Sequence, residues 1–216
     1  MARTFNLTLT GAQEAPTPVA SGAIGTGTVL WDEAAGTAAY TVTVAGLDFG
    51  PLLGLAPQTA NTGDDVTNMH VHNAPLGVAG PVVFGQIGPS HDTDDLSVTP
   101  SPDGSWTVSG VWEATDPANV SIAAFADALT AAFAGDEVPL YFNVHTRSFP
   151  AGEIRGQWVA GEGAGGAGHL GDFDGDGQAD ILWRGRAGEA VVWTMDGAQV
   201  AGAAALPNPT AYWAVA

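Results

Sequence analysis

Alternation of apolar and polar residues runs through most of the first 160 residues. In 4–10 and again in 38–44, every second residue is apolar and the residues between them are mainly polar. Because successive side chains of a β-strand point to opposite faces, such alternation predicts strands that bury one face. The same pattern predicts further strands at 25–31, 66–72, 81–87, 105–112, 140–145 and 152–159.

Residues 117–134 follow a helical period instead. Apolar residues recur there at helical spacing and are expected in the core: Ile122, Phe125, Leu129 and Phe133. Asp116 is placed to cap this helix, Pro117 suits its first turn, and Gly135 suits its end. Many short strands with one helix predict an all-β fold, an antiparallel Greek-key-like β-sandwich with one inserted helix.

The character of the chain changes after residue 160. Residues 161–168 are rich in glycine, as in a flexible linker. Residues 169–216 carry an aspartate-glycine loop, followed by a hairpin with strands at 179–184 and 189–195. We therefore expect a sandwich domain over 1–160, a linker over 161–168 and a small β unit over 169–216.

The charge balance narrows the possible partners. The formal net charge is −18, the basic residues are five arginines, and lysine and cysteine are absent. This charge repels nucleic acid and anionic membranes and suits divalent cations. No apolar run approaches the ~20 residues that span a bilayer. The missing cysteines exclude disulfides, thiolate zinc sites and thiol catalysis.

Other sequence signals exclude some enzyme classes and leave the location open. The sequence contains no phosphate loop, serine nucleophile elbow or helical zinc motif, so we do not expect a kinase, nuclease or protease. The first ten residues alternate like a strand and lack the apolar segment of a signal peptide. An extracellular protein would then have lost its leader or be exported by another route; the alternative is that it stays inside the cell.

Four histidines are candidate metal ligands. His70 and His72 lie two residues apart in a predicted strand, so their side chains share a face and their Cα atoms lie roughly 6–7 Å apart. His145 ends a later strand, and His91 lies in the acidic loop 88–102. Several imidazoles on a β scaffold suit copper or zinc. The alternative is that they are surface or hydrogen-bonded histidines.

A second candidate site is the loop that begins at Asp172. Oxygen ligands are expected at its positions 1, 3, 5, 7 and 9, from Asp172, Asp174, Asp176, the main-chain carbonyl of Gln178, and Asp180. This arrangement of hard oxygen ligands favours calcium over magnesium. The loop differs from an EF-hand because its twelfth residue is Trp183 and a strand follows. The alternative is an acidic surface turn.

Residues 171–184 (GDFDGDGQADILWR) resemble an FG-GAP/VCBS-type repeat, a propeller-blade unit with a calcium loop that is common in surface and secreted proteins. The resemblance implies a blade-like β-hairpin in the tail. One such unit cannot bury its own apolar face, because repeat folds need about three. We therefore expect the tail to pack on another chain as a homo-oligomer or assembly, or on the first domain, or to be part of a longer array.

The order of the histidines is similar to the order of metal ligands in copper/zinc superoxide dismutases, which are also Greek-key sandwiches. That resemblance implies a copper site of His70, His72 and His145, with His91 as a fourth or bridging ligand. It also implies that Arg147 or Arg155 guides superoxide. For Arg155 the alternative is an ion pair with Glu153, which shares its strand face.

Three motifs together resemble the CHRD domain, named from chordin. They occupy 9–16 (LTGAQEAP), 70–75 (HVHNAP) and 143–157 (NVHTRSFPAGEIRGQ). The resemblance implies a β-sandwich and an extracellular or cell-surface setting, and it supplies no reaction.

Two hypotheses about function follow. The first is an extracellular metal-binding protein with a copper or zinc site at the histidines, able to act like a superoxide dismutase, and a calcium loop in its tail. The second is a structural or adhesive surface protein without enzymatic activity, which self-assembles through the calcium-stabilised repeat.

Overall fold

The computed structural model describes residues 2–87, 94–161, 171–174, 178–184 and 189–206. The chain divides into two compact units, 1–162 and 163–216.

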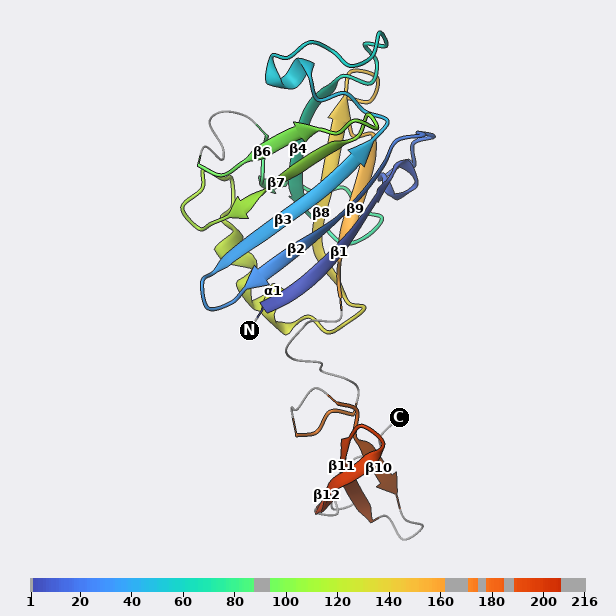
Figure 1. The fold of residues 1–216 in the computed structure, drawn as a ribbon, viewed down its shortest axis with the longest axis vertical. Coiled ribbons are helices and arrows are strands. Elements are labelled where there is room, and N and C mark those ends of the chain that lie inside the picture. Colours follow the sequence, from blue (N-terminus) through green and yellow to red (C-terminus); the bar gives the residue numbers. More distant parts are fainter. Residues whose placement is uncertain (1, 88–93, 162–170, 175–177, 185–188, 207–216) are drawn as a thin grey trace. The chain divides into compact units, whose positions relative to one another are not determined.

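A curled antiparallel sheet forms the first unit (Figure 1). Its strands are β1 (Ala2–Thr10), β2 (Ile24–Asp32), β3 (Thr37–Ala45), β4 (Val66–Asn73), β5 (Val82–Phe84), β6 (Ser97–Pro100), β7 (Trp106–Trp112), β8 (Glu137–Thr146) and β9 (Ile154–Ala160). They lie in the order β5-β4-β8-β9-β1-β2-β3-β7-β6. Short 3-10 helices follow β1 (η1, Gly11–Gln13) and β3 (η2, Pro51–Leu53).

Aromatic side chains hold the two halves of the curled sheet together. Trp112 on β7 stacks on Trp158 of β9 with ring centroids 5.6 Å apart, although three strands separate β7 from β9 in the sheet order. Trp112 also stacks on Tyr40 and lies 5.3 Å from the ring of Phe142. Figure 1 shows β3, β7 and β6 lying across β4 and β8. The predicted all-β antiparallel fold is confirmed.

The alternation seen in the sequence builds this core. Phe5 and Leu9 of β1 are fully buried, and so are Val42 and Val44 of β3, because each strand turns one face inward. Burial of one such side chain contributes about 1.5–3 kcal/mol. The prediction of a loop over 88–102 is wrong in part, because β6 lies inside that segment.

The predicted helix over 117–134 is wrong in extent. The structure has a 3-10 helix, η3 (Ile122–Phe125), that continues into α1 (Ala126–Ala131). The backbone N–H groups of Asn119 and Val120 donate to the carbonyl of Val83 on β5, so the segment before η3 bonds to the sheet and not to itself.

Both helix ends also differ from the prediction. Ser121 caps η3 by accepting a hydrogen bond from the N–H of Ala123, whereas the Asp116 carboxylate accepts from the N–H of Glu113. Phe133, expected in the core, is 58% exposed, because the chain leaves α1 before it.

The second unit holds a three-stranded antiparallel sheet of β10 (Ile181–Arg184), β11 (Ala190–Asp196) and β12 (Gln199–Leu206). The first two strands form the predicted hairpin, and β12 adds a strand that the sequence pattern did not indicate. Trp183 and Trp193 meet edge to face across the hairpin, with ring centroids 5.0 Å apart. Across the described part of the chain, none of the helices has the length and apolar character needed to cross a membrane.

Candidate metal centres

Three of the four candidate histidines meet across the pairing of β4 with β8. In this register His70 faces Asn143, and His145 faces Asn68, so His70 and His145 are diagonal neighbours. Their Nε2 atoms lie 2.9 Å apart. The ring of His72 lies 4.6 Å from that of His70. One ligand nitrogen from each of the three lies within 4.8 Å of the others. His91 lies outside the described residues.

The histidines are buried although they point away from the apolar core. Met69 and Val71 fill the core side of β4, so His70 and His72 lie on its outer face. His70 is 5% exposed, and His72 and His145 are each 9% exposed. The chain segments after β4 and after β8 cover this face, since the carbonyls of Gly80 and Pro150 bond to His72 and His145.

Hydrogen bonds to main-chain carbonyls orient two of the rings. The Nδ1–H group of His72 donates to the carbonyl of Gly80 at 2.7 Å, and that of His145 donates to the carbonyl of Pro150 at 3.1 Å. This choice of tautomer leaves each of these Nε2 atoms unprotonated, the form in which histidine binds a metal. The Nε2 of His145 then accepts the Nε2–H of His70 at 2.9 Å, so His70 would have to shift its proton to Nδ1 to bind the same ion. The Nδ1 atom of His70 and the Nε2 atom of His72 are buried without a hydrogen-bond partner.

The site keeps its histidines neutral. Burial, followed by the neighbouring His145 and His72, lowers the pKa of His70 to about 3. Burial also lowers the pKa values of His72 and His145, although their hydrogen bonds to main-chain carbonyls oppose the shift. Neutral imidazoles do not have to lose a proton before they bind a metal.

The segment 74–81, which supplies the Gly80 carbonyl, is fastened by Arg155 of β9. Its guanidinium donates to the carbonyl of Val78 at 2.8 Å and to that of Pro75 at 2.9 Å. Gln157 adds a bond from its side-chain amide to the carbonyl of Ala74 and accepts one from Arg155. Arg155 is only 1% exposed, so these bonds replace its contact with water.

Tyr141 links this clamp to His72. Its ring is stacked on that of His72 at 4.7 Å and 4°, and the guanidinium carbon of Arg155 lies 3.5 Å from the centre of the tyrosine ring. The Tyr141 hydroxyl accepts the N–H of Gly80 at 3.1 Å. A side chain on Gly80 would collide with the carbonyl of Asn73, so glycine is required where the segment returns to His72. Sequence reasoning missed Tyr141 and Gly80, which carry no motif of their own.

The two candidate arginines have different surroundings. Arg147 is 60% exposed, and its Nε lies 3.1 Å from the carboxylate of Asp65. Arg155 is buried, and the expected ion pair with Glu153 is replaced by other contacts. Glu153 instead accepts hydrogen bonds from the hydroxyls of Ser21 and Thr146.

Glu14 is a buried carboxyl group that sequence reasoning treated only as part of a motif. It is 6% exposed, and its Oε2 atom accepts a hydrogen bond of 3.4 Å from the amide of Asn143, the residue opposite His70. Burial raises the pKa of Glu14 to about 7, against the opposing effects of Asn143 and Arg155. The carboxyl is therefore partly protonated near neutral pH.

The acidic loop of the second unit brings three of its predicted ligands together. One oxygen each from Asp172, Asp174 and Asp180 lies within 4.8 Å of the others. The carboxylate of Asp180 also shapes the loop, because it accepts the N–H groups of Phe173 and Met195. The side chain of Gln178 accepts the N–H of Gly197, and Asp176 lies outside the described residues.

Glu14→Gln is expected to alter the pH dependence of stability. Between pH 4.5 and about 7 the unfolded chain has lost the Glu14 proton while the folded chain keeps it, so Glu14 lowers the free energy of unfolding as pH rises. Relative to wild type, the free energy of unfolding of the variant should rise by about 1–2 kcal/mol across this window. Urea titrations of the metal-free wild type and variant at several pH values measure this difference in the free energy of unfolding. Glu137→Gln, at an exposed position, is the matched control. If the free energy of unfolding depended on pH in the same way in both variants, the raised pKa of Glu14 would be contradicted.

Arg155→Met is expected to release the segment 74–81. The variant keeps much of the side chain's length but loses its donors to two carbonyls, so stability should fall by about 2–4 kcal/mol. Amide exchange at Gly80 should accelerate as well. Arg147→Met, at an exposed position, should cost less than about 1 kcal/mol. Equal stability of the two variants would show that Arg155 does not fasten the segment.

Comparison with known proteins agrees with the extent of the first unit. The CHRD domain family model matches residues 5–158, which include the three clustered histidines, Glu14 and Arg155. No curated protein and no solved structure matches the chain. The match covers well over half of the sequence, so the chain belongs to the CHRD domain family.

Proposed function

We propose that His70, His72 and His145 form a transition-metal site and that this protein acts as an extracellular metal-binding protein. The observation that carries the proposal is a buried cluster of three neutral imidazoles, two of which have Nδ1 tied to main-chain carbonyls. Three nitrogens around a tetrahedral ion would lie about 3.3 Å apart at metal–nitrogen distances near 2.0 Å. The Nε2 atoms of His70 and His145 lie 2.9 Å apart, and one nitrogen of His72 lies within 4.8 Å of both rings' ligand atoms.

Copper is favoured over zinc. Nitrogen ligands bind divalent copper more tightly than zinc in the general order of affinities, and the chain has no thiolate to favour zinc. Three histidines also leave a coordination position open, as in catalytic sites. His91 remains a proposed fourth ligand.

Dismutation of superoxide is the reaction that a copper ion at this site would support, since copper can exchange single electrons. Two superoxide ions and two protons would yield oxygen and hydrogen peroxide. Arg147 is the exposed arginine of the candidate pair, although it is paired with Asp65, and we propose it as the one that attracts the anion. Arg155 contacts Tyr141 and the segment 74–81, and its proposed role is to position His72. The net charge of −18 opposes the approach of superoxide, so metal binding is the primary proposal.

Elemental analysis after copper loading and dialysis is expected to find one copper per chain. His70→Ala and His145→Ala should each lower retention at least tenfold, because each removes a ligand. Asn68→Ala, on the same strand face, is the matched control and should retain copper. Equal retention by all variants would overturn the site. Activity of the loaded protein no greater than that of free copper would remove the dismutase proposal alone.

A second candidate function has its own support in the tail. The second unit exposes large apolar side chains, with Phe173 at 52%, Leu182 at 49% and Trp183 at 49%. A three-stranded sheet needs a packing partner to bury such residues. We propose calcium at Asp172, Asp174, Asp176, the Gln178 carbonyl and Asp180, and self-assembly of surface copies through this sheet.

Calcium is expected to raise the melting temperature of the second unit and to promote self-association. The ion would neutralise the clustered carboxylates of Asp172 and Asp174, whose combined replacement by asparagine should abolish both effects. Asp196→Asn, an acid of the same unit outside the loop, is the control. Calorimetry and analytical ultracentrifugation provide the measurements. A protein that stays monomeric with an unchanged melting temperature would contradict this second function.

A further inference from the structure

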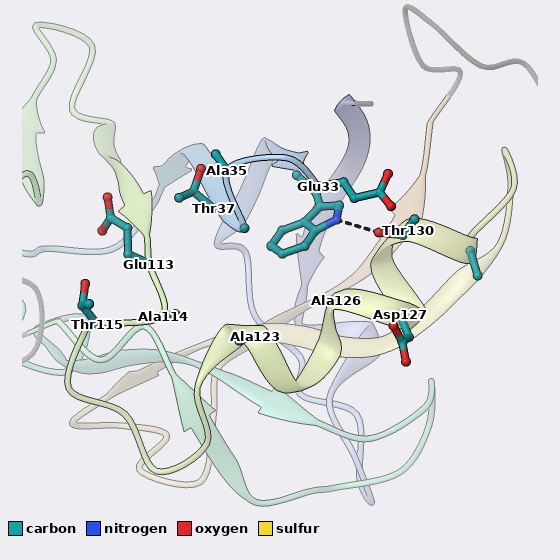
Figure 2. Close-up of a pocket in the computed structure, with 13 residues that line it drawn as sticks. Glu33, Ala35, Thr37, Glu113, Ala114, Thr115, Ala123, Ala126, Asp127 and Thr130 are labelled. Carbon is teal, nitrogen blue, oxygen red and sulfur yellow. Dashed lines mark hydrogen bonds between the residues drawn. The ribbon is translucent and has the colours of Figure 1, made fainter.

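A cavity of about 680 Å³ lies in the first unit, lined by residues outside the histidine site. One wall is the helical segment η3–α1, and the turn between β2 and β3 lies opposite (Figure 2). Residues 113–115, which follow β7, complete the lining. The volume is typical of sites for small organic molecules, which range over roughly 300–1,000 Å³.

The surface of this cavity is largely carbon. Methyl groups of several alanines line it, from both walls and from the segment after β7: Ala35, Ala114, Ala123, Ala126 and Ala131. The indole of Trp31 contributes as well, and its N–H already donates to the hydroxyl of Thr130 at 3.0 Å (Figure 2). A ligand therefore needs an apolar body.

The charged groups around the cavity have one sign. Glu113 lies at one end, and Glu33 and Asp127 lie at the other (Figure 2). None of the described residues that line the cavity is basic. The net charge of −18 adds a field that concentrates cations near the surface. An anion is disfavoured, and an ammonium group on the ligand gains from the carboxylates at whichever end of the cavity it occupies.

The geometry points to a binding site for a small organic ammonium ion, with its carbon body against the alanines and its charge near the carboxylates. The site is separate from the proposed metal centre, so the two proposals stand or fall independently. The small side chains leave the cavity open, because larger residues at the alanine positions would fill the space.

Titration of the full-length protein with hexylammonium chloride, followed by NMR, tests the site. Saturable shifts are expected at the Trp31 indole N–H and at the amides of Ala123 and Ala126. Hexanol, which has the same carbon chain without the charge, should bind at least fivefold more weakly. Asp127→Asn should weaken hexylammonium binding about three- to fivefold, the effect of one partly solvated ion pair. Glu137→Gln removes an exposed carboxylate elsewhere on the unit and should leave affinity unchanged.

Ala123→Leu fills the cavity from an exposed position and should weaken binding at least tenfold. Ala131→Leu, also exposed, does so from further along the helical wall, and an unchanged spectrum of the β-sheet shows that each variant is folded. Binding that survives both leucine variants would overturn the proposal. Equal affinity for hexanol and hexylammonium, or shifts confined to other parts of the protein, would overturn it as well.

Discussion

A guanidinium that is removed from water has to find its partners inside the protein, and the arrangement around the histidines depends on how Arg155 does so. Its donors reach the carbonyls of Val78 and Pro75, which holds the segment 74–81 against β8 and β9. That segment then returns the Gly80 carbonyl to His72. The ring of Tyr141, stacked between the guanidinium and the imidazole, makes the three side chains one packed unit. The motifs 70–75 and 143–157 thus belong to one network of contacts around the histidines.

The protein combines an acidic surface with an interior site built from neutral nitrogen. The carboxylates that dominate its charge attract cations in general, whereas the buried imidazoles of the proposed site would select cations that accept nitrogen ligands. Burial acts on Glu14 as it does on the histidines, because it favours the neutral form, here the protonated carboxyl near neutral pH. Desolvation is therefore the dominant influence on every titratable group around β4 and β8 whose pKa departs clearly from its ordinary value.

Strands with strict alternation were predictable, and so was the shared face of His70 and His72. The extent of the helix was not predictable, because the periodic pattern carries no information about the competing hydrogen bonds of Asn119 and Val120 to Val83. A tertiary hydrogen bond to a carbonyl of the sheet overrides the local helix propensity of this segment. The sequence suggests His145 as a third ligand. Its diagonal position relative to His70, however, depends on strand register, which no short pattern encodes.

The sequence by itself determined the class of fold, the division into a large and a small β unit, and the residue types available for chemistry. These follow from local properties, namely side-chain alternation, glycine content and the kinds of ligand atoms present. Only the tertiary structure decided that the outer face of β4 is buried, that Arg155 faces carbonyls and Arg147 faces solvent, and that an alanine-lined cavity opens beside α1. Burial and hydrogen-bond partners depend on segments far apart in the chain, so they exist only once the sheet has curled and its loops have closed over it.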